Sequence, residues 1–334
     1  MREITAGELS KMFKEHSVKK ILKEHERWID TDEKEGKRAD LSYADLSGAN
    51  LRKAKLSNAD LRKTNLSDAD LSNANLSDAE VSNADLSDAD LSDANLLCAE
   101  LSGAKLSGAR LSGVNLRDAD LSNANLSDAN MHGADLSDAN LSNADLSDAD
   151  LSGVDLSNAD LRNADLGDAD LSNANLSDAD LCNADLSDAD LSDVDLSDAN
   201  LLCAELSGAK LSGAKLSGAD LGEAEVSNAD LSNADLSDAN LKYANLYGAD
   251  LSGADLSDAN LRNAILSGVD LSSADLSDAD LSDADLSNAD LSEVHGLNIE
   301  RFSKVETLYK AELDHEIINQ VKDKYPHLLK KPKI

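Results

Sequence analysis

Two copies of one five-residue unit occupy residues 139–148, which read Ala139-Asn140-Leu141-Ser142-Asn143-Ala144-Asp145-Leu146-Ser147-Asp148. The unit, Ala-(Asp/Asn)-Leu-Ser-(Asp/Asn/Gly), recurs from residue 39 to residue 294 without an insertion. Leucine stands at every fifth position from Leu41 to Leu291, 51 positions in all, and only Val81, Met131 and Val226 replace it. A period kept over so many units is typical of a solenoid, in which each unit packs against its neighbours.

A period of five fits neither a straight helix nor a continuous strand. Five residues of α-helix advance by about 500°, so the leucines would wander around the helix surface. On a strand, an odd period would place successive leucines on opposite faces. All leucines share one interior only if the chain turns a corner once per unit, and Ser, Asp, Asn and Gly are residues that favour such turns. The sequence therefore predicts an all-β solenoid of short extended pieces and corners.

The unit resembles the repeat of the pentapeptide repeat family, and the resemblance covers residues 39–294. It implies a right-handed, four-sided β-helix with four units in each coil. The 51 units then make roughly 12–13 coils, and coils spaced about 4.8 Å apart make a rod about 61 Å long. Two features differ from many members of the family, because no Phe occupies the central position and no loop interrupts the coil.

The two ends of the chain lack the repeat and are predicted to cap it. Residues 1–38 carry apolar residues at helical spacing from Val18 to Trp28, which predicts a short N-terminal helical cap. Residues 39–294 form the β-helix, and residues 295–334 are expected to form a C-terminal cap from an irregular coil and a helix. Caps cover the leucines and unpaired strand edges of a solenoid's ends. Resemblance to some family members makes the C-terminal cap a candidate homodimer contact as well.

The composition limits the function. The 334 residues carry a formal net charge of −35, and aromatic residues make up only 2% of them. Such a charge repels nucleic acid phosphates and anionic membrane surfaces, so we expect no direct binding to either. No apolar run is long enough for a membrane span, and the N-terminus lacks the apolar core of a signal peptide, which favours a cytoplasmic protein. The three cysteines fit a reducing compartment.

The sequence offers no recognisable catalytic site. Of its six histidines, only His132 lies within the repeat. No nucleophile–base pair, metal-ligand spacing or phosphate-binding loop is visible. We therefore expect neither an enzyme nor a cofactor or metal site.

Residues 20 apart should stack on successive coils, which turns the sequence into surface columns. Two columns are acidic and are candidate partner-binding surfaces: Asp128, Asp148, Asp168 and Asp188 in one, and Asp178, Asp198, Asp238, Asp258 and Asp278 in the other. The repeat as a whole holds 51 acidic and 13 basic residues, net −38. Over about 61 Å this is roughly one charge per 1.6 Å, close to the value of about one per 1.7 Å in B-DNA.

This charge density suggests a specific use. Several pentapeptide repeat proteins mimic DNA and occupy the DNA-binding saddle of gyrase, a type II topoisomerase, and the acidic rod resembles them. The resemblance implies a non-enzymatic rod that binds a topoisomerase or another DNA-binding protein in place of DNA. The alternative interpretation is a solvated acidic surface that keeps a long rod soluble.

A second hypothesis is a rigid scaffold or interaction module for a protein partner unrelated to DNA. Tyr243, Tyr247, Ile265 and Leu202 replace polar residues at outward positions and form a candidate exposed apolar patch. Exposed patches that contain tyrosine are enriched at protein interfaces. The alternative explanation is sequence drift on a tolerant surface.

Overall fold

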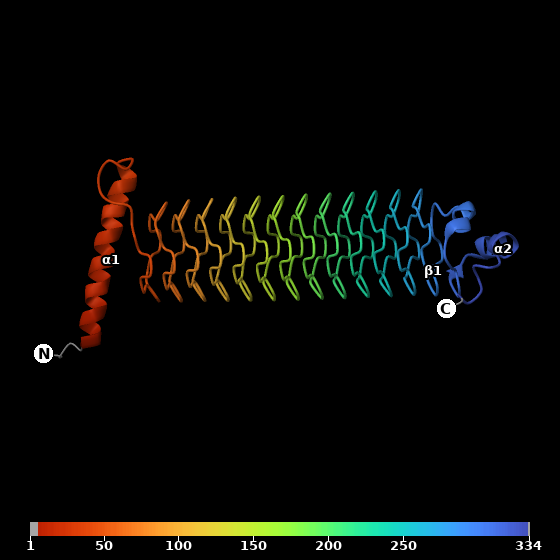
Figure 1. The fold of residues 1–334 in the computed structure, drawn as a ribbon, viewed down its shortest axis with the longest axis horizontal. Helices are drawn as coiled ribbons and strands as arrows, with labels where there is room; N and C mark the ends of the chain where they lie inside the picture. Colours follow the sequence, from red (N-terminus) through yellow and green to blue (C-terminus); the bar gives the residue numbers. More distant parts are fainter. Residues whose placement is uncertain (1–5, 333–334) are drawn as a thin grey trace.

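The computed structural model describes residues 6–332, with the side chains of residues 17–332. A long helix, a straight stack of coils and a compact C-terminal segment follow one another along a rod (Figure 1). The elements in chain order are helix α1 (Ala6–Asp30), strand β1 (Asp290–Leu291), 3₁₀-helix η1 (Ile299–Lys304), strand β2 (Glu312–Leu313) and helix α2 (His315–Lys324). The coils fill the chain between α1 and β1.

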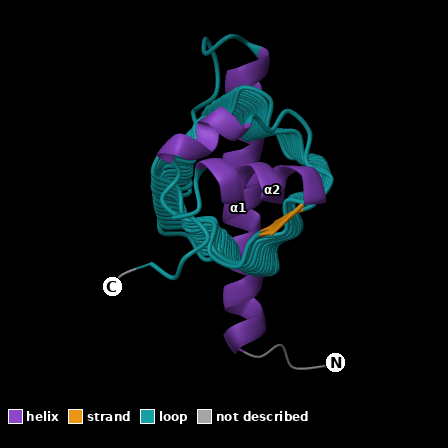
Figure 2. Cartoon of the chain, turned by 90° about the vertical axis from the view of Figure 1, so that its right-hand side faces the viewer, coloured by secondary structure: helices purple, strands orange, loops and turns teal. Residues whose placement is uncertain are grey.

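Each coil contains 20 residues, because bridges join residues 20 apart. Asp145 pairs in parallel with Asp165, and Asp165 pairs with Asp185. Four units therefore close one coil, and the chain is a β-helix solenoid that looks like a ring from its end (Figure 2). Nearly all these contacts are single-residue bridges, and within residues 6–332 a two-residue parallel ladder forms only between β1 and β2. The right-handed sense of the coil stays a prediction.

Every backbone N–H of a repeating unit can find an acceptor within the rod, as residues 144–148 illustrate. Ala144 donates to Leu141 within the same corner, and Asp145 donates to the carbonyl of Ala124 in the preceding coil. Leu146 and Asp148 donate to carbonyls of the following coil, at 2.7 and 3.0 Å. The fifth N–H, of Ser147, has no backbone partner and donates to the Oδ1 atom of Asp145 at 3.2 Å. In units such as this one, the carboxylate or amide before the leucine is therefore part of the backbone hydrogen bonding.

The corner of each unit explains the choice between Asp, Asn and Gly two residues after the leucine. This residue has a positive φ throughout the rod, 58° at Asp148 and 64° at Gly153. Together with the bond from Ala149 N–H to the carbonyl of Leu146, 3.1 Å long, this matches a type II turn. Gly, Asn and Asp are the residues that adopt such a conformation at least cost.

The interior is built from leucine and alanine. Every central position from Leu41 to Leu291 is at most 5% exposed, and nearly all the alanines two residues earlier are buried beside them. The three aromatic residues of the repeat, Tyr43, Tyr243 and Tyr247, all lie on the outside. Burial of each leucine stabilises the fold by roughly 1.5–3 kcal/mol relative to an exposed side chain. A narrow coil filled in this way explains why a stable fold of this size contains so few aromatic residues.

Helix α1 lies across the first coil, with its axis across the rod (Figures 1 and 2). Val18, Ile21 and Leu22 pack against the core, and His25 is fully buried. With 25 residues, α1 is longer than the short cap expected from the sequence and extends past the edge of the rod. Within residues 6–332, no helix combines the length and apolar character that a bilayer crossing requires.

The C-terminal segment covers the last coil. Phe302 of η1 and Val321 of α2 are fully buried, and Leu308 and Leu328 are buried with them. Ile317 of α2 also packs against the core. Because α2 directs these apolar residues at its own rod, they are not available to a second chain. Homodimerisation through the C-terminal cap stays a prediction.

Candidate partner-binding surfaces

All nine aspartates predicted as partner-binding residues lie at the corners of the coil and are exposed. Their φ angles fall between 56° and 59°. The column of Asp128, Asp148, Asp168 and Asp188 and the column that begins at Asp178 are two units apart, and so they lie on opposite edges of a four-sided coil. The corner conformation accounts for Asp, Asn or Gly at these positions, but it does not account for a negative charge.

A second set of aspartates stands directly before the leucine in many units, and no role was predicted for these residues from the sequence. Asp150 is half-buried, and its Oδ1 atom accepts hydrogen bonds from the N–H and the hydroxyl of Ser152, at 3.1 and 2.6 Å. The Asp135 carboxylate binds Ser137 in the same way. Because Oδ1 is used by the corner, the side chain is held in one orientation. These aspartates add a fixed negative charge next to the corner aspartates.

The two sets combine on one edge of the rod into three rows of three aspartates, which we call the acidic edge. It consists of Asp145, Asp148, Asp150, Asp165, Asp168, Asp170, Asp185, Asp188 and Asp190. Successive rows are one coil apart, about 4.8 Å. Among the described residues, only Asp190 of these nine forms an ion pair, with Lys210 at 3.3 Å. The acidic edge is therefore largely uncompensated.

Polar neighbours delimit the acidic edge at both ends. The Asn125 and Asn130 amides of the preceding coil donate to Oδ2 of Asp145 and Asp150, at 3.2 and 2.9 Å. At the other end, the Ser192 hydroxyl and then Lys210 hold the pKa of Asp190 below its ordinary value, although burial acts against them. Asp190 therefore remains ionised to lower pH than an ordinary aspartate.

The opposite edge of the rod carries a weaker charge. Asn158, Asn175 and Asn200 alternate with its aspartates, and the Asn200 amide donates to Asp180 at 2.9 Å. Arg162 neutralises Asp160 through a 2.6 Å ion pair, and the arginine holds the pKa of this carboxyl below its usual range. The sequence-predicted residues Asp178, Asp198, Asp238 and Asp258 belong to this mixed surface.

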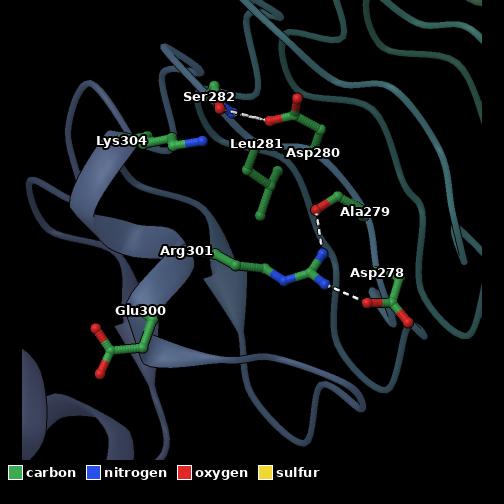
Figure 3. Close-up of a pocket in the computed structure, with 8 residues that line it drawn as sticks. All are labelled: Asp278, Ala279, Asp280, Leu281, Ser282, Glu300, Arg301 and Lys304. Carbon is green, nitrogen blue, oxygen red and sulfur yellow. Dashed lines mark hydrogen bonds and ion pairs between the residues drawn. The ribbon is translucent and has the colours of Figure 1, made fainter.

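Asp278 has a different role from the other predicted aspartates. Its Oδ1 atom accepts a 2.5 Å hydrogen bond from Arg301 of η1, and the same guanidinium donates to the carbonyl of Ala279 (Figure 3). These residues line a pocket of about 370 Å³ between the last coil and η1, together with Glu300 and Lys304. The lining thus combines acidic side chains of the last coil with basic side chains of η1, and this pairing of opposite charges can hold the cap on the rod. Asp278 therefore joins the cap to the rod.

The four residues of the predicted apolar patch are exposed, but they are only partly contiguous. Tyr243, Tyr247 and Ile265 are 50%, 55% and 44% exposed, and they lie on two successive coils along one side of the rod, which runs from the corner at Tyr243 to the corner at Gly248. Leu202 is 36% exposed but lies two coils before Lys242 in the same column. Sequence reasoning did not include Tyr43, which at 73% is the most exposed large apolar residue described.

No catalytic or metal-binding arrangement is found among the described residues. No group of three or more His, Cys, Asp or Glu side chains could hold a metal ion. His132 contacts the hydroxyl of Ser152 at 2.9 Å and is exposed. Cys98, Cys182 and Cys203 are free thiols.

Comparison with known proteins agrees with this geometry. The sequence model described as Pentapeptide repeats matches overlapping segments that together run from residue 37 to residue 292. The chain belongs to the pentapeptide repeat family. None of the curated proteins compared with this chain matches its sequence.

Several solved structures of pentapeptide repeat proteins resemble the chain. HetL, involved in heterocyst differentiation regulation in the cyanobacterium Nostoc sp. strain PCC 7120, is 33% identical over 78% of this chain and 94% of its own, with a TM-score of 0.33. A thylakoid lumen protein of Arabidopsis thaliana is 24% identical over 36% and 74%, with a TM-score of 0.28. QnrB1, a plasmid-mediated fluoroquinolone resistance protein, is 20% identical over 66% and 96%, with a TM-score of 0.29.

Proposed function

We propose that this pentapeptide repeat protein is a non-enzymatic, cytoplasmic rod that binds a DNA-binding protein, such as a type II topoisomerase, by taking the place of DNA. The observation that carries the proposal is the dense negative charge of the acidic edge, which exceeds that of the opposite edge. The rod contacts the DNA-binding surface of its partner and has no direct contact with nucleic acid.

The negative charge is concentrated in the middle of the rod. Residues 118–209 contain 22 acidic residues and a single basic one, Arg162. At about 4.8 Å per coil these residues extend over about 22 Å. Their net charge therefore amounts to roughly one per 1.1 Å, above the one per 1.7 Å of B-DNA. A protein groove that binds duplex DNA through Lys and Arg could therefore bind this segment, because the linear density of negative charge is comparable.

The distribution of Asp and Asn between neighbouring corners supports a selected charge pattern. Asn123, Asn143, Asn163 and Asn183 stand at one corner of four successive coils, and Asp128, Asp148, Asp168 and Asp188 stand at the next corner of the same coils. Both sets have φ between 56° and 59°. Because the backbone accepts either residue, the corner conformation does not explain the segregation. A requirement for solubility alone would be met by aspartates on any side.

A rigid rod is suited to this role. Backbone hydrogen bonds join every coil to the next, and the rod is straight (Figure 1). The carboxylates before the leucines are oriented by their serine partners, as in Asp145 and Ser147. Charges that are already in place need little ordering when a partner binds, which favours affinity.

Competition with DNA tests the proposal. Labelled duplex DNA bound to a bacterial type II topoisomerase should be displaced by the protein at low salt, and displacement should weaken as salt screens the charges. The triple replacement Asp148→Asn, Asp168→Asn and Asp188→Asn should weaken displacement by about tenfold. The matched control is Asp178→Asn, Asp198→Asn and Asp238→Asn on the opposite edge, which removes the same net charge and should have a smaller effect. Absence of displacement at low salt would contradict the proposal for this partner.

A further inference from the structure

Tyr243 occupies a corner that disfavours it. Its φ is 64°, a conformation that most side chains other than Gly, Asn and Asp avoid. The ring is 50% exposed, so burial does not compensate for the conformation. The Nζ atom of the neighbouring Lys242 lies 4.8 Å from the centroid of the Tyr243 ring, and among the described residues this is the one cation–π or aromatic contact of the ring. Strain kept at an exposed position is a reason to look for a function.

Two further apolar side chains adjoin Tyr243. Ile265 lies one coil after Asn245, with which it pairs. All other positions of this column carry polar residues. Tyr247 stands where twelve other coils carry Ser or Gly. Beside them, the corner column contains Gly248 and Gly268, and a Cβ atom at Gly268 would meet nothing within 4 Å. Tyr243, Tyr247 and Ile265, the tyrosine patch, therefore border a strip where a partner can approach the backbone.

Carboxylates surround the tyrosine patch. Glu225 and Asp285 lie in the column of Ile265, and Glu223 lies in the column of Tyr243. Asp250 and Asp270 lie in the next column, beyond the glycines. The two nearby cations are already engaged, because Lys242 covers the Tyr243 ring and Arg262 lies 4.0 Å from Asp280. The surroundings of the patch are therefore anionic.

We propose that the tyrosine patch docks an extended segment of a partner protein that presents an apolar side chain between basic residues. The apolar side chain packs on Tyr243, Tyr247 and Ile265, and its basic neighbours pair with the surrounding carboxylates. A second copy of this chain does not fit, because it would bring the same carboxylates face to face. The proposal stands beside that of DNA mimicry and does not depend on it.

The patch and the acidic edge share one side of the rod. Asp145, Asp165 and Asp185 lie in the same column as Ile265, which follows Asp185 by four coils. At about 4.8 Å per coil this separation is about 19 Å. The two surfaces are thus far enough apart to be tested separately.

Two synthetic peptides test the docking proposal on the full chain, one of repeated Lys-Leu-Lys-Gly and one of repeated Lys-Ser-Lys-Gly. The wild-type protein should bind the leucine peptide about tenfold more tightly, because leucine burial adds to the shared charge attraction. The triple variant Tyr243→Asn, Tyr247→Ser and Ile265→Asn installs residues that the repeat uses elsewhere, so it should fold. It should bind both peptides equally, as measured by fluorescence anisotropy.

Two controls make the result specific. Tyr43→Asn removes an exposed tyrosine at the other end of the rod and should retain the preference for leucine. The variant Asp148→Asn, Asp168→Asn and Asp188→Asn should keep the ratio of the affinities for the two peptides, because the acidic edge is separated from the patch by more than a Debye length. A leucine preference that survives in the patch variant, is lost in the acidic-edge variant, or is absent from the wild type would overturn the proposal.

Discussion

The buried imidazole of His25 in α1 accepts, through Nδ1, a 3.0 Å hydrogen bond from the backbone N–H of Ala39, where the repeat begins. The His25 ring stacks on Trp28 with 5.5 Å between ring centroids. Its Nε2 atom is buried without a hydrogen-bond partner among the described residues. Because Nδ1 accepts, the proton of the neutral ring lies on Nε2. This hydrogen bond joins the N-terminal helix to the first residue of the repeat, beside the apolar contacts of the helix, and requires a neutral histidine.

Acidification should loosen the N-terminal cap. Burial lowers the pKa of His25 below its ordinary value of 6.5, and Arg38 lowers it further, whereas the backbone of Ser57 raises it. Between the lowered pKa and 6.5 the unfolded chain binds more protons, so stability is full above about pH 6.5 and decreases as the pH falls below it. Trp28, the single tryptophan, reports on this region in urea titrations. We expect the urea midpoint reported by Trp28 to be lower at pH 5.5 than at pH 7.5. Both pH values lie about one unit from the ordinary pKa of histidine.

The variant His25→Asn provides the control for this pH dependence. An Asn Oδ1 atom can accept the Ala39 hydrogen bond but does not titrate. The variant should be less stable at neutral pH because it fills less of the buried space. Its Trp28 midpoint should change much less between the two pH values than that of the wild type. An equal change in both proteins would mean that other groups cause the acid sensitivity.

A mid-rod leucine should be intolerant of shortening. Leu166 is 0% exposed, so Leu166→Ala should lower the free energy of unfolding by about 2–5 kcal/mol. Leu166→Asp should be more severe, because it buries an unpaired carboxylate. Leu166→Met is the conservative control and should cost less than about 1.5 kcal/mol, as Met131 already fills an equivalent buried position. Urea unfolding followed by circular dichroism measures these differences, and equal losses for Ala and Met would contradict the close packing described above.

The residue before each leucine should matter for its oxygen rather than for its charge. Asp135→Ala removes the acceptor for the Ser137 N–H and hydroxyl, at 3.1 and 2.6 Å, and should cost about 1–3 kcal/mol. Asp135→Asn keeps Oδ1 and should change stability by less than about 0.5 kcal/mol. The same urea assay compares the two variants. If Asn were as damaging as Ala, the charge and not the hydrogen bond would support the corner.

The repeat made the core predictable, because a period of five leaves only one arrangement that places every leucine inside. The role of residues such as Asp145 was less accessible, since only the complete set of donors shows that the Ser147 N–H lacks a backbone partner. The columns required the number of units per coil, which came from family resemblance. The cap contact between Arg301 and Asp278 could not be predicted, because the repeat ends before residue 301 and its period gives no register there.

The strain at Tyr243 leads to the last prediction. Replacement of this residue by Asn, which occupies the same corner at Asn263 with a φ of 59°, should relieve the conformational cost of a bulky residue at positive φ. Because the ring is half exposed, little packing is lost with it. Tyr243→Asn should therefore raise the free energy of unfolding by up to about 1 kcal/mol. Tyr247→Ser, at a position without positive φ, is the matched control and should be neutral.

Urea midpoints of the two single variants decide between two explanations for the tyrosine. If Tyr243→Asn stabilises the rod, the native chain keeps an unfavourable residue at an exposed corner, as expected for a surface that serves a partner. If Tyr243→Asn destabilises the rod by more than about 0.5 kcal/mol, the ring contributes to the fold itself, through Lys242 or its neighbours, and no partner is needed to account for it. The stability measurement thus constrains the docking proposal without any knowledge of the partner.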